Sequence, residues 1–346
     1  MKPLTDSFDR KHSYARISVT DRCNLRCIYC RPSDGTLAGM PPQGIRLKER
    51  SEILTFDEIE RLAKLFSLMG ITKIRLTGGE PLVRKDLPVL VEQISKVPGI
   101  GTLGMTTNGV LLENFAHQLK ASGLTHLNIS LDTLRPSRFE QLTLRQNYHD
   151  VIAGINSALD AGFRTLKLNT VIIGGVNDDE LPDFVDFVRD KPVNIRFIEY
   201  MPFKSNQWNR GKLISFRQMK DKIEERYDLI PLEKSQNGVS KDFRIEGFIG
   251  TVGFITSMSD QFCGTCNRIR LTADGSIKSC LFHPAEINLR SMLRDNSSDK
   301  TISEMIQFAI SAKPYSHPNA EELMSICAKG ESAFGGENRS MMQIGG

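Results

Sequence analysis

The residues of this sequence that are best suited to chemistry are its cysteines, seven in all. Six of them fall into two groups: Cys23, Cys27 and Cys30 in the pattern C-x3-C-x2-C, and Cys263, Cys266 and Cys280 in the pattern C-x2-C-x13-C. Thiolates are soft ligands that bind zinc and hold iron–sulfur clusters. An odd, tightly clustered set of cysteines in a chain of 346 residues favours metal ligation in a reducing compartment over a disulfide framework.

Neither group contains an evident fourth ligand. Structural zinc sites usually join one C-x2-C pair to a second such pair, so zinc at either group would need a further ligand, such as His283 for the second group. A 4Fe-4S cluster held by three cysteines instead leaves one iron open to bind a small molecule. The spacing favours a cluster at the first group, whereas the second group taken alone also fits zinc. The seventh cysteine, Cys327, is expected to be a buried free thiol.

The two groups flank a repeat of strands and helices that must position them. Apolar, strand-like segments occur at residues 16–20, 73–77, 102–107, 126–131, 165–173 and 194–200. Helical periodicity fills the segments between these strands, and a further amphipathic helix is predicted at residues 215–227. Strands and helices that alternate about every thirty residues indicate parallel β/α structure.

Polar and glycine-bearing segments follow the strands directly: TGGEP, TTNG, SLD, GGVND and EYMP. The C-terminal ends of the strands carry the active site in a parallel β/α barrel, so these segments are expected to line it. We predict an α/β fold with an incomplete (β/α)6 barrel over residues 1–240 and a smaller C-terminal iron–sulfur domain over residues 241–346. An open doubly wound sheet is the alternative topology. Residues 314–346 are expected to pack poorly unless something holds them.

The overall composition excludes several functions. The sequence has 45 Lys and Arg against 41 Asp and Glu, and this small excess gives no reason to expect a nucleic-acid-binding surface. Any anion site must therefore be local. No apolar run of about 18 residues and no signal-peptide pattern occurs, which predicts a soluble protein without membrane association. Bacterial cytoplasm is the expected location, although a mature protein of the mitochondrial matrix would show the same features.

Longer segments carry a resemblance to a known superfamily. The first cysteine motif, with an aromatic residue before its last cysteine, resembles the cluster loop of radical S-adenosylmethionine (SAM) enzymes, and TGGEP resembles their glycine-rich stretch after the second strand. Further segments extend the resemblance over nearly the whole chain: KIRLTGGEPLVR, NISLD, RFIEYMP, CGTCNRIRLTADG and the terminal Gly-Gly. The sequence is thereby similar to the GTP 3',8-cyclase family, which acts first in molybdenum cofactor biosynthesis.

The resemblance implies a set of ligands and contacts. Each cysteine group would hold one 4Fe-4S cluster, the first with an open iron for SAM and the second with an open iron for the guanine of GTP. The positions that match SAM contacts are Tyr29, Gly79, Ser130 and Met201. The positions that match GTP contacts are Arg16, Arg75, Thr106, Lys167, Arg268 and Arg270, with Lys73 and Arg196 as weaker candidates. No acid–base residue is expected, and the tail with Gly345 and Gly346 would reach back into the active site.

The two arginines in NRIRL are the part of this set that physical reasoning supports by itself. Arg268 and Arg270 alternate, so both would project from the same face of a strand. Several fixed cations must converge on a triphosphate, and the planar guanidinium suits phosphate well. These two positions are therefore expected to contact the triphosphate.

The implied activity is cyclisation of GTP to (8S)-3',8-cyclo-7,8-dihydroguanosine 5'-triphosphate with SAM and two 4Fe-4S clusters. The implied partners are GTP, an external electron donor, the downstream cyclic pyranopterin monophosphate synthase and a second copy of the chain. One alternative is a radical SAM enzyme that matures a peptide, although such enzymes usually have more cysteines in the C-terminal domain. Another alternative is a non-catalytic zinc-binding or cluster-carrying protein, which would not cleave SAM.

Overall fold

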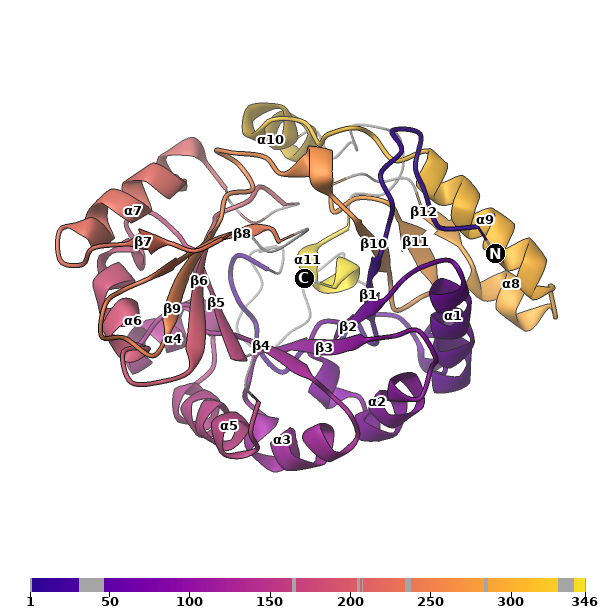
Figure 1. The fold of residues 1–346 in the computed structure, drawn as a ribbon, viewed down its shortest axis with the longest axis horizontal. Helices are drawn as coiled ribbons and strands as arrows, with labels where there is room; N and C mark the ends of the chain where they lie inside the picture. Colours follow the sequence, from indigo (N-terminus) through magenta and orange to yellow (C-terminus); the bar gives the residue numbers. More distant parts are fainter. Residues whose placement is uncertain are drawn as a thin grey trace.

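The computed structural model describes residues 2–30, 47–163, 166–203, 206, 208–233, 238–282, 286–328 and 339–345. In these residues twelve strands form one sheet in the order β12-β11-β10-β1-β2-β3-β4-β5-β6-β9-β8-β7. Figure 1 shows the strands as an arc with helices around the outside, and the short C-terminal helix α11 (Met341–Ile344) within the arc. The predicted α/β fold with an incomplete barrel is confirmed, and the open doubly wound alternative is wrong.

Six parallel strands form the centre of the barrel. They are β1 (Tyr14–Ser18), β2 (Lys73–Thr77), β3 (Thr102–Thr107), β4 (His126–Ser130), β5 (Leu166–Ile172) and β6 (Val193–Glu199). Each pairs in parallel with the next along the chain. The strands correspond one to one with the predicted segments, and their bounds differ from the prediction by two residues or fewer.

The later part of the chain adds strands at both edges of this centre. On one edge β9 (Thr251–Ile255) pairs in parallel with β6, and β8 (Ser240–Arg244) and β7 (Ile230–Pro231) follow antiparallel. On the other edge β10 (Arg268–Leu271) pairs in parallel with β1, and β11 (Ser276–Lys278) and β12 (Glu286–Asn288) follow antiparallel. Strands on both sides of residue 240 thus belong to one sheet, and the domain boundary at that position stays a prediction.

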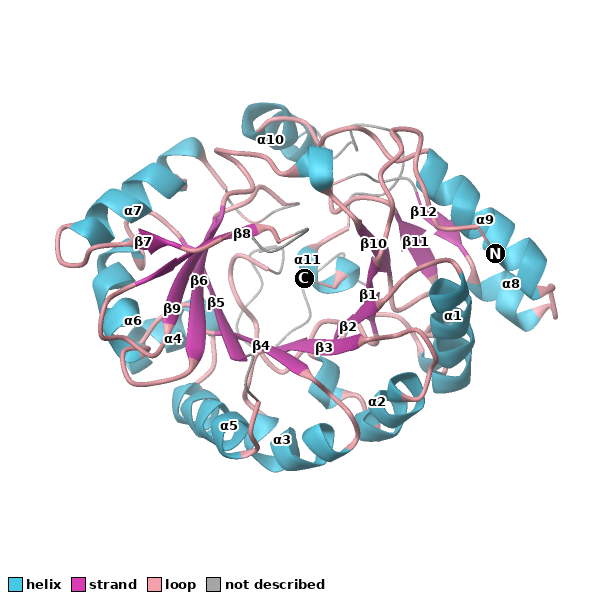
Figure 2. Ribbon diagram, in the orientation of Figure 1, coloured by secondary structure: helices cyan, strands magenta, loops and turns pink. Residues whose placement is uncertain are grey.

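Most of the helices form an outer layer over the sheet, whereas α11 lies inside the arc of strands (Figure 2). Around the six central strands lie α1 (Phe56–Leu68), α2 (Leu87–Ser95), α3 (Leu112–Ala121), α4 (Pro136–Thr143), α5 (Tyr148–Asp160) and α6 (Leu181–Phe187). The later helices are α7 (Phe216–Glu224), α8 (Arg290–Arg294), α9 (Asp299–Ser311), α10 (Ala320–Ala328) and α11. Helix α7 confirms the predicted amphipathic helix, and a capping box of Ser215 and Gln218 fixes its start. None of the helices in the described ranges combines the length and apolar character that crossing a membrane requires.

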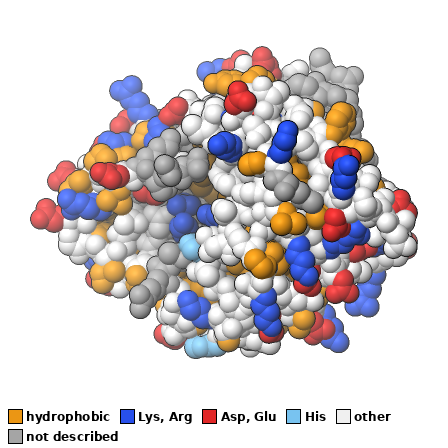
Figure 3. All heavy atoms as spheres, turned by 45° about the vertical axis from the view of Figure 1, so that its right-hand side comes forward, with side chains coloured by type: hydrophobic (Ala, Val, Ile, Leu, Met, Phe, Trp, Pro, Cys, Tyr) orange, Lys and Arg blue, Asp and Glu red, His pale blue; other side chains and the backbone are white. Residues whose placement is uncertain are grey.

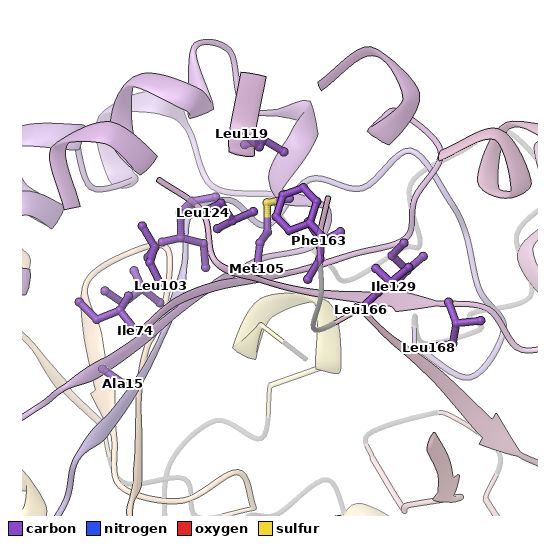
Figure 4. Close-up of a cluster of buried hydrophobic side chains, with 14 of the residues drawn as sticks. Ala15, Ile74, Leu103, Met105, Leu119, Leu124, Ile129, Phe163, Leu166 and Leu168 are labelled. Atoms are coloured by element: carbon purple, nitrogen blue, oxygen red, sulfur yellow. The ribbon is translucent and has the colours of Figure 1, made fainter. Parts of the chain in front are cut away.

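The hydrophobic core lies between the convex face of the sheet and these helices. Figure 4 shows Ile74, Leu103, Met105 and Ile129 of the strands together with Leu119 of α3, and all five are buried. Because side chains alternate along a strand, the neighbours of these residues project to the concave face. Those neighbours are polar in most of the central strands, so the inside of the barrel is built for a polar ligand.

Candidate active site

Three arginines form a row across adjacent strands on the concave face. The sheet register places Arg270 of β10 opposite Arg16 of β1, and Arg16 opposite Arg75 of β2. Two residues earlier along these strands, Tyr14 of β1 pairs with Arg268 of β10 on one side and with Lys73 of β2 on the other. Cations that sequence reasoning drew from opposite ends of the chain are thus brought together on one surface.

The Arg75 guanidinium is held in place by its surroundings. Its Nε donates to the Tyr14 hydroxyl at 2.7 Å, and its Nη1 donates to the carbonyl oxygen of Met105 at 2.8 Å. Gly104 of β3 makes room for it, because a Cβ at that position would lie 3.0 Å from Arg75 Nη2. The glycine in this strand is therefore explained by close approach of the arginine.

The cations on this face shift the pKa values of their neighbours. Burial and nearby cations, first among them Arg196 and Arg75, lower the pKa of Lys167 to about 8. Burial alone would raise the pKa of Tyr14, but the charges of Arg75 and Arg16 outweigh it and lower this pKa to about 7. Both shifts show an excess of positive charge that an anion would relieve. Figure 3 shows Lys and Arg side chains gathered where one face of the molecule is hollowed.

Several buried polar atoms on the central strands lack a partner among the described residues. They are Thr77 Oγ1 of β2, Thr106 Oγ1 of β3, Asn128 Oδ1 of β4 and Asn169 Oδ1 of β5. Thr106 and Asn128 are paired in the sheet register, so their side chains lie side by side. An unsatisfied buried polar group costs about 1–3 kcal/mol, which a polar ligand in the barrel would recover. Of these residues, sequence reasoning had selected only Thr106.

The first cysteine loop follows β1 and is anchored to the end of α4. The Arg26 N–H donates to the Thr143 carbonyl oxygen at 2.9 Å, and the Ile28 N–H donates to the Leu142 carbonyl oxygen at 3.0 Å. Burial, together with the neighbouring thiols of Cys30 and Cys23, raises the pKa of Cys27 well above its usual value. Thiols that are buried together in this way need a metal centre to become thiolates, so the loop fits a cluster.

A cavity adjoins this loop at the C-terminal ends of β3 and β4. Its lining includes Cys27, Tyr29, Asn108, Ser130 and Asp132. The Tyr29 hydroxyl donates to Asp132, and burial raises the pKa of Asp132 to about 6. The structure therefore places two of the predicted SAM contacts, Tyr29 and Ser130, against one cavity beside the first cysteine loop.

The other two predicted SAM contacts follow β2 and β6. Gly79 must be glycine, because a Cβ there would lie 2.3 Å from the Arg22 carbonyl oxygen. Its N–H donates to the Thr20 carbonyl oxygen at 2.8 Å, which ties the TGGEP segment to the chain entering the cysteine loop. Met201 lies just past β6, where its carbonyl oxygen accepts a 2.8 Å hydrogen bond from Asn206.

The second cysteine loop, which contains Cys263 and Cys266, lies just before β10. The Cys266 N–H donates to the Cys263 carbonyl oxygen at 3.0 Å, which makes a tight turn between the two thiols. Burial would raise the pKa of Cys266, but the charges of Arg268 and Lys313 lower it to about 6. A thiol that ionises this readily suits a metal ligand. Arg268 is thus placed between the cysteine loop and the arginine row.

Some predicted residues lie outside the described parts of the chain: His283, Gly346 and the side chain of Cys327. Among the described residues, no group of three or more His, Cys, Asp or Glu side chains is close enough to enclose a single metal ion. The thiols of each triad nevertheless interact electrostatically. Sequence reasoning missed Tyr14, Asn128 and Asn169. The sequence did contain a signal for these residues. Parallel strands are normally apolar on both faces, so the alternation of polar and apolar residues in these strands is unusual.

Two family models match this chain, one over each of its two cysteine loops. The model of the Radical SAM superfamily matches residues 17–188, which include the end of β1, the first cysteine loop and β2 to β5. The model described as Molybdenum Cofactor Synthesis C matches residues 193–319, which include the second cysteine loop and the arginines of β10.

Individual relatives support the same assignment. GTP 3',8-cyclase of Petrotoga mobilis is 43% identical over 91% of this chain and 94% of its own length. Molybdenum cofactor biosynthesis protein 1 of Bos taurus is 46% identical over 91% of this chain, but the match covers 48% of that protein. The chain thus spans about half the length of several curated relatives that it matches. The crystal structure of Streptococcus suis SuiB bound to SAM shares the fold, with a TM-score of 0.56 at 15% identity over 86% of this chain and 68% of that one.

Proposed function

Because the chain belongs to the GTP 3',8-cyclase family of radical SAM enzymes, we propose that it converts GTP to (8S)-3',8-cyclo-7,8-dihydroguanosine 5'-triphosphate, the first step of molybdenum cofactor biosynthesis. The observation that carries this proposal is the row of Arg270, Arg16 and Arg75 inside the barrel. Cys23 of the first triad follows the C-terminal end of β1, and Cys266 of the second triad precedes the N-terminal end of the neighbouring strand β10. A nucleoside triphosphate provides the negative charge that the concave face lacks.

Cys23, Cys27 and Cys30 are the residues that would hold the first 4Fe-4S cluster. With SAM bound, that cluster would supply one-electron reduction of SAM, which is the source of the hydrogen-abstracting chemistry. The cavity beside Tyr29 and Ser130 would receive SAM, and the carboxylate of Asp132 would orient it through Tyr29. With SAM bound, the apolar lining of this cavity, which includes Leu25, Phe139 and Leu142, would help to keep water from the reactive species.

Cys263, Cys266 and Cys280 would hold the second cluster, which would offer its open iron to the guanine. The triphosphate would then lie along the arginine row, with Lys167 adding charge from β5 and Thr106 a hydroxyl from β3. The role of these side chains is to bind and orient the nucleotide so that its ribose faces the SAM cavity. No side chain needs to transfer a proton in this scheme, and we assign none as a general acid or base.

The proposal includes three partners beyond GTP. An external one-electron donor would reduce the clusters, and the cyclic pyranopterin monophosphate synthase would consume the product. We also propose that two copies of the chain form a homodimer. The bacterial cytoplasm or the mitochondrial matrix would provide the reducing conditions that thiolate ligands require.

Anaerobic reconstitution with iron and sulfide tests this function. We expect about eight irons per chain, because each 4Fe-4S cluster contributes four. Addition of a reductant, SAM and GTP should then yield 5'-deoxyadenosine and the cyclised nucleotide. A protein that holds about four irons and cleaves SAM but leaves GTP unchanged would still be a radical SAM enzyme. GTP would then not be its substrate, and a peptide would be the next substrate to test. Zinc without SAM cleavage would contradict the enzyme itself.

A further inference from the structure

Lys313 contacts the second cysteine loop although it follows Cys266 by 47 residues. Its Nζ lies 3.4 Å from Cys266 Sγ, 3.4 Å from the Cys266 carbonyl oxygen and 2.9 Å from the Arg268 carbonyl oxygen. The residue is only 3% exposed. An ammonium at this distance can donate a charge-assisted hydrogen bond to a thiolate sulfur.

Among the described residues, the negative charge that balances this buried ammonium comes from the cysteines. No carboxylate in the described part of the chain lies within 4.0 Å of Lys313 Nζ. A buried ammonium is strongly unfavourable unless an anion lies beside it. The groups of opposite charge that act on Lys313 are the thiolates of Cys266 and Cys280. The position of Lys313 therefore makes physical sense when these thiolates are present, as they are in a metal-bound state.

One guanidinium holds both Lys313 and the cysteine loop in place. Arg10 donates to the Cys263 carbonyl oxygen at 2.8 Å, and also to the carbonyl oxygens of Pro314 at 2.8 Å and Tyr315 at 2.7 Å. Arg10 is itself fixed by Asp6, whose Oδ2 lies 2.6 Å from Nε. The segment that begins at Lys313 is thus tied to the cysteine turn, and this fixes the contact between Nζ and Sγ.

The first cysteine triad has the opposite electrostatic surroundings. One donor to Cys23 Sγ is the neutral amide of Asn108, at 3.8 Å. The carboxylate of Asp132 acts on Cys27 in addition to the thiols of Cys23 and Cys30. Hydrogen bonds to cluster sulfurs and nearby charge both set the reduction potential of an iron–sulfur cluster. The contacts described around the two triads therefore favour different reduction potentials.

We propose that Lys313 is a positioning residue that raises the reduction potential of the second cluster through its hydrogen bond to Cys266. This inference rests on the proposed function, in which the second triad holds a 4Fe-4S cluster. A one-electron reductant adds one negative charge to the cluster, while Lys313 keeps its proton and no protein bond breaks. A fixed cation beside Cys266 stabilises this added charge, so the reduced form gains more than the oxidised form.

Replacement of Lys313 separates this role from substrate binding. Arg268 also donates to Cys266 through its N–H and its side chain, but it is a candidate phosphate ligand, so its variants would change two properties. Lys313→Met removes the charge and keeps the length of the side chain. Lys313→Arg keeps the charge. Lys300→Met is the matched control, because Lys300 lies on α9 and its side chain is 85% exposed.

The experiment is a redox titration followed by electron paramagnetic resonance in the background Cys23→Ala, Cys27→Ala and Cys30→Ala, where the second cluster alone gives a signal. At a fixed potential we expect Lys313→Met to lower the ratio of reduced to oxidised cluster about tenfold, which is 59 mV for one electron. Lys313→Arg should restore most of the shift, and Lys300→Met should show none. A potential in Lys313→Met equal to that of the unsubstituted background would overturn the inference.

Cluster assembly decides the remaining outcomes. If Lys313→Met loses iron, Lys313→Gln, which keeps a neutral donor, is titrated in its place with the same expectation. If both neutral variants lose the cluster and Lys313→Arg retains it, the positive charge is required to hold the anionic cluster, which upholds the electrostatic role. Loss of the cluster in all three variants would show that Lys313 has a packing role, and it would overturn the electrostatic role. A background protein that binds no iron contradicts the second cluster itself, and hence the proposed function rather than the role of Lys313.

Discussion

The Arg270 guanidinium donates a 2.7 Å hydrogen bond to the carbonyl oxygen of Gly345, 75 residues later in the chain. The contact holds the C-terminal segment inside the barrel, where α11 lies in Figure 1. Gly345 has a φ of +79°, and a Cβ there would lie 2.5 Å from Thr77 Oγ1 and 2.9 Å from Ser18 Cβ. The tail and the proposed triphosphate site therefore share Arg270.

The first prediction is that Gly345→Ala weakens GTP turnover by displacing the tail. The added Cβ has no room, so the hydrogen bond from Arg270 should be lost, and a hydrogen bond to a charged group is worth roughly 1.5–3 kcal/mol. We expect kcat/KM for GTP to fall about ten- to hundredfold, which corresponds to that energy. Gly162→Ala is the control, because Gly162 has a similar φ of +76° but nothing within 4 Å of its Cβ position. Equal losses in both variants would show a general effect of backbone strain.

The second prediction concerns the pH dependence of GTP binding. Lys167, with its pKa lowered to about 8, carries its charge below that pH and loses it above. Tyr14, with its pKa lowered to about 7, becomes an anion among the cations above that pH. Both changes weaken anion binding as the pH rises, so GTP affinity should fall from pH 7 to about pH 9.

Equilibrium binding of GTP to the wild type and to Lys167→Met measures this effect. The ratio of the two dissociation constants cancels the ionisation of GTP itself. The advantage of the wild type should be largest near pH 7 and should shrink above pH 8, since the ammonium is then lost. A ratio that stays constant from about pH 7 to about pH 9 would remove Lys167 from the anion site.

A third prediction tests why TGGEP contains its second glycine. Gly79→Ala would force the chain away from the Arg22 carbonyl oxygen, just before the first cysteine loop. We expect the variant to retain about four irons where the wild type holds about eight, because the first cluster is lost and the second is kept. Gly101→Ala is the control, since the nearest atom to its Cβ position is 4.0 Å away. Iron content equal to that of the wild type in Gly79→Ala would contradict the assigned close approach.

The fourth prediction concerns the hydrophobic layer of Figure 4. Phe163 is 1% exposed and packs between strands and helices, so Phe163→Ala should lower the free energy of unfolding by about 3–5 kcal/mol. Leu68→Ala, at a position 60% exposed, should change it by less than about 0.5 kcal/mol. Urea unfolding of the metal-free protein measures both values. Similar losses for the two variants would mean that the core does not lie where the structure places it.

The central barrel could be predicted from the sequence because its signals are local. Apolar strand segments and helical periodicity are readable over ten residues, and β1 to β6 follow from them. The glycines and polar residues after β2 and β3 also mark the active-site end of a parallel barrel. The cysteine spacings, taken with their flanking segments, were sufficient to identify the superfamily.

The remaining features depend on contacts between distant parts of the chain. Arg16 and Arg270 become neighbours only because β10 pairs with β1, and no local pattern specifies that pairing. The same holds for Lys313, which reads as a surface lysine after a helix, and for Arg10, which reads as one charge in a polar N-terminal segment. The inward polar positions of β4 and β5 are different, since their alternation with apolar residues was visible in the sequence.

The measurement that tests the whole account most directly compares Cys23→Ala with Cys263→Ala. Both variants are reconstituted anaerobically, and 5'-deoxyadenosine and cyclised nucleotide are assayed after addition of reductant, SAM and GTP. If the two triads hold clusters for different ligands, Cys23→Ala should form neither product, and Cys263→Ala should still release 5'-deoxyadenosine while forming no cyclised nucleotide. SAM cleavage equal to that of the wild type in both variants would contradict the assignment of the two triads.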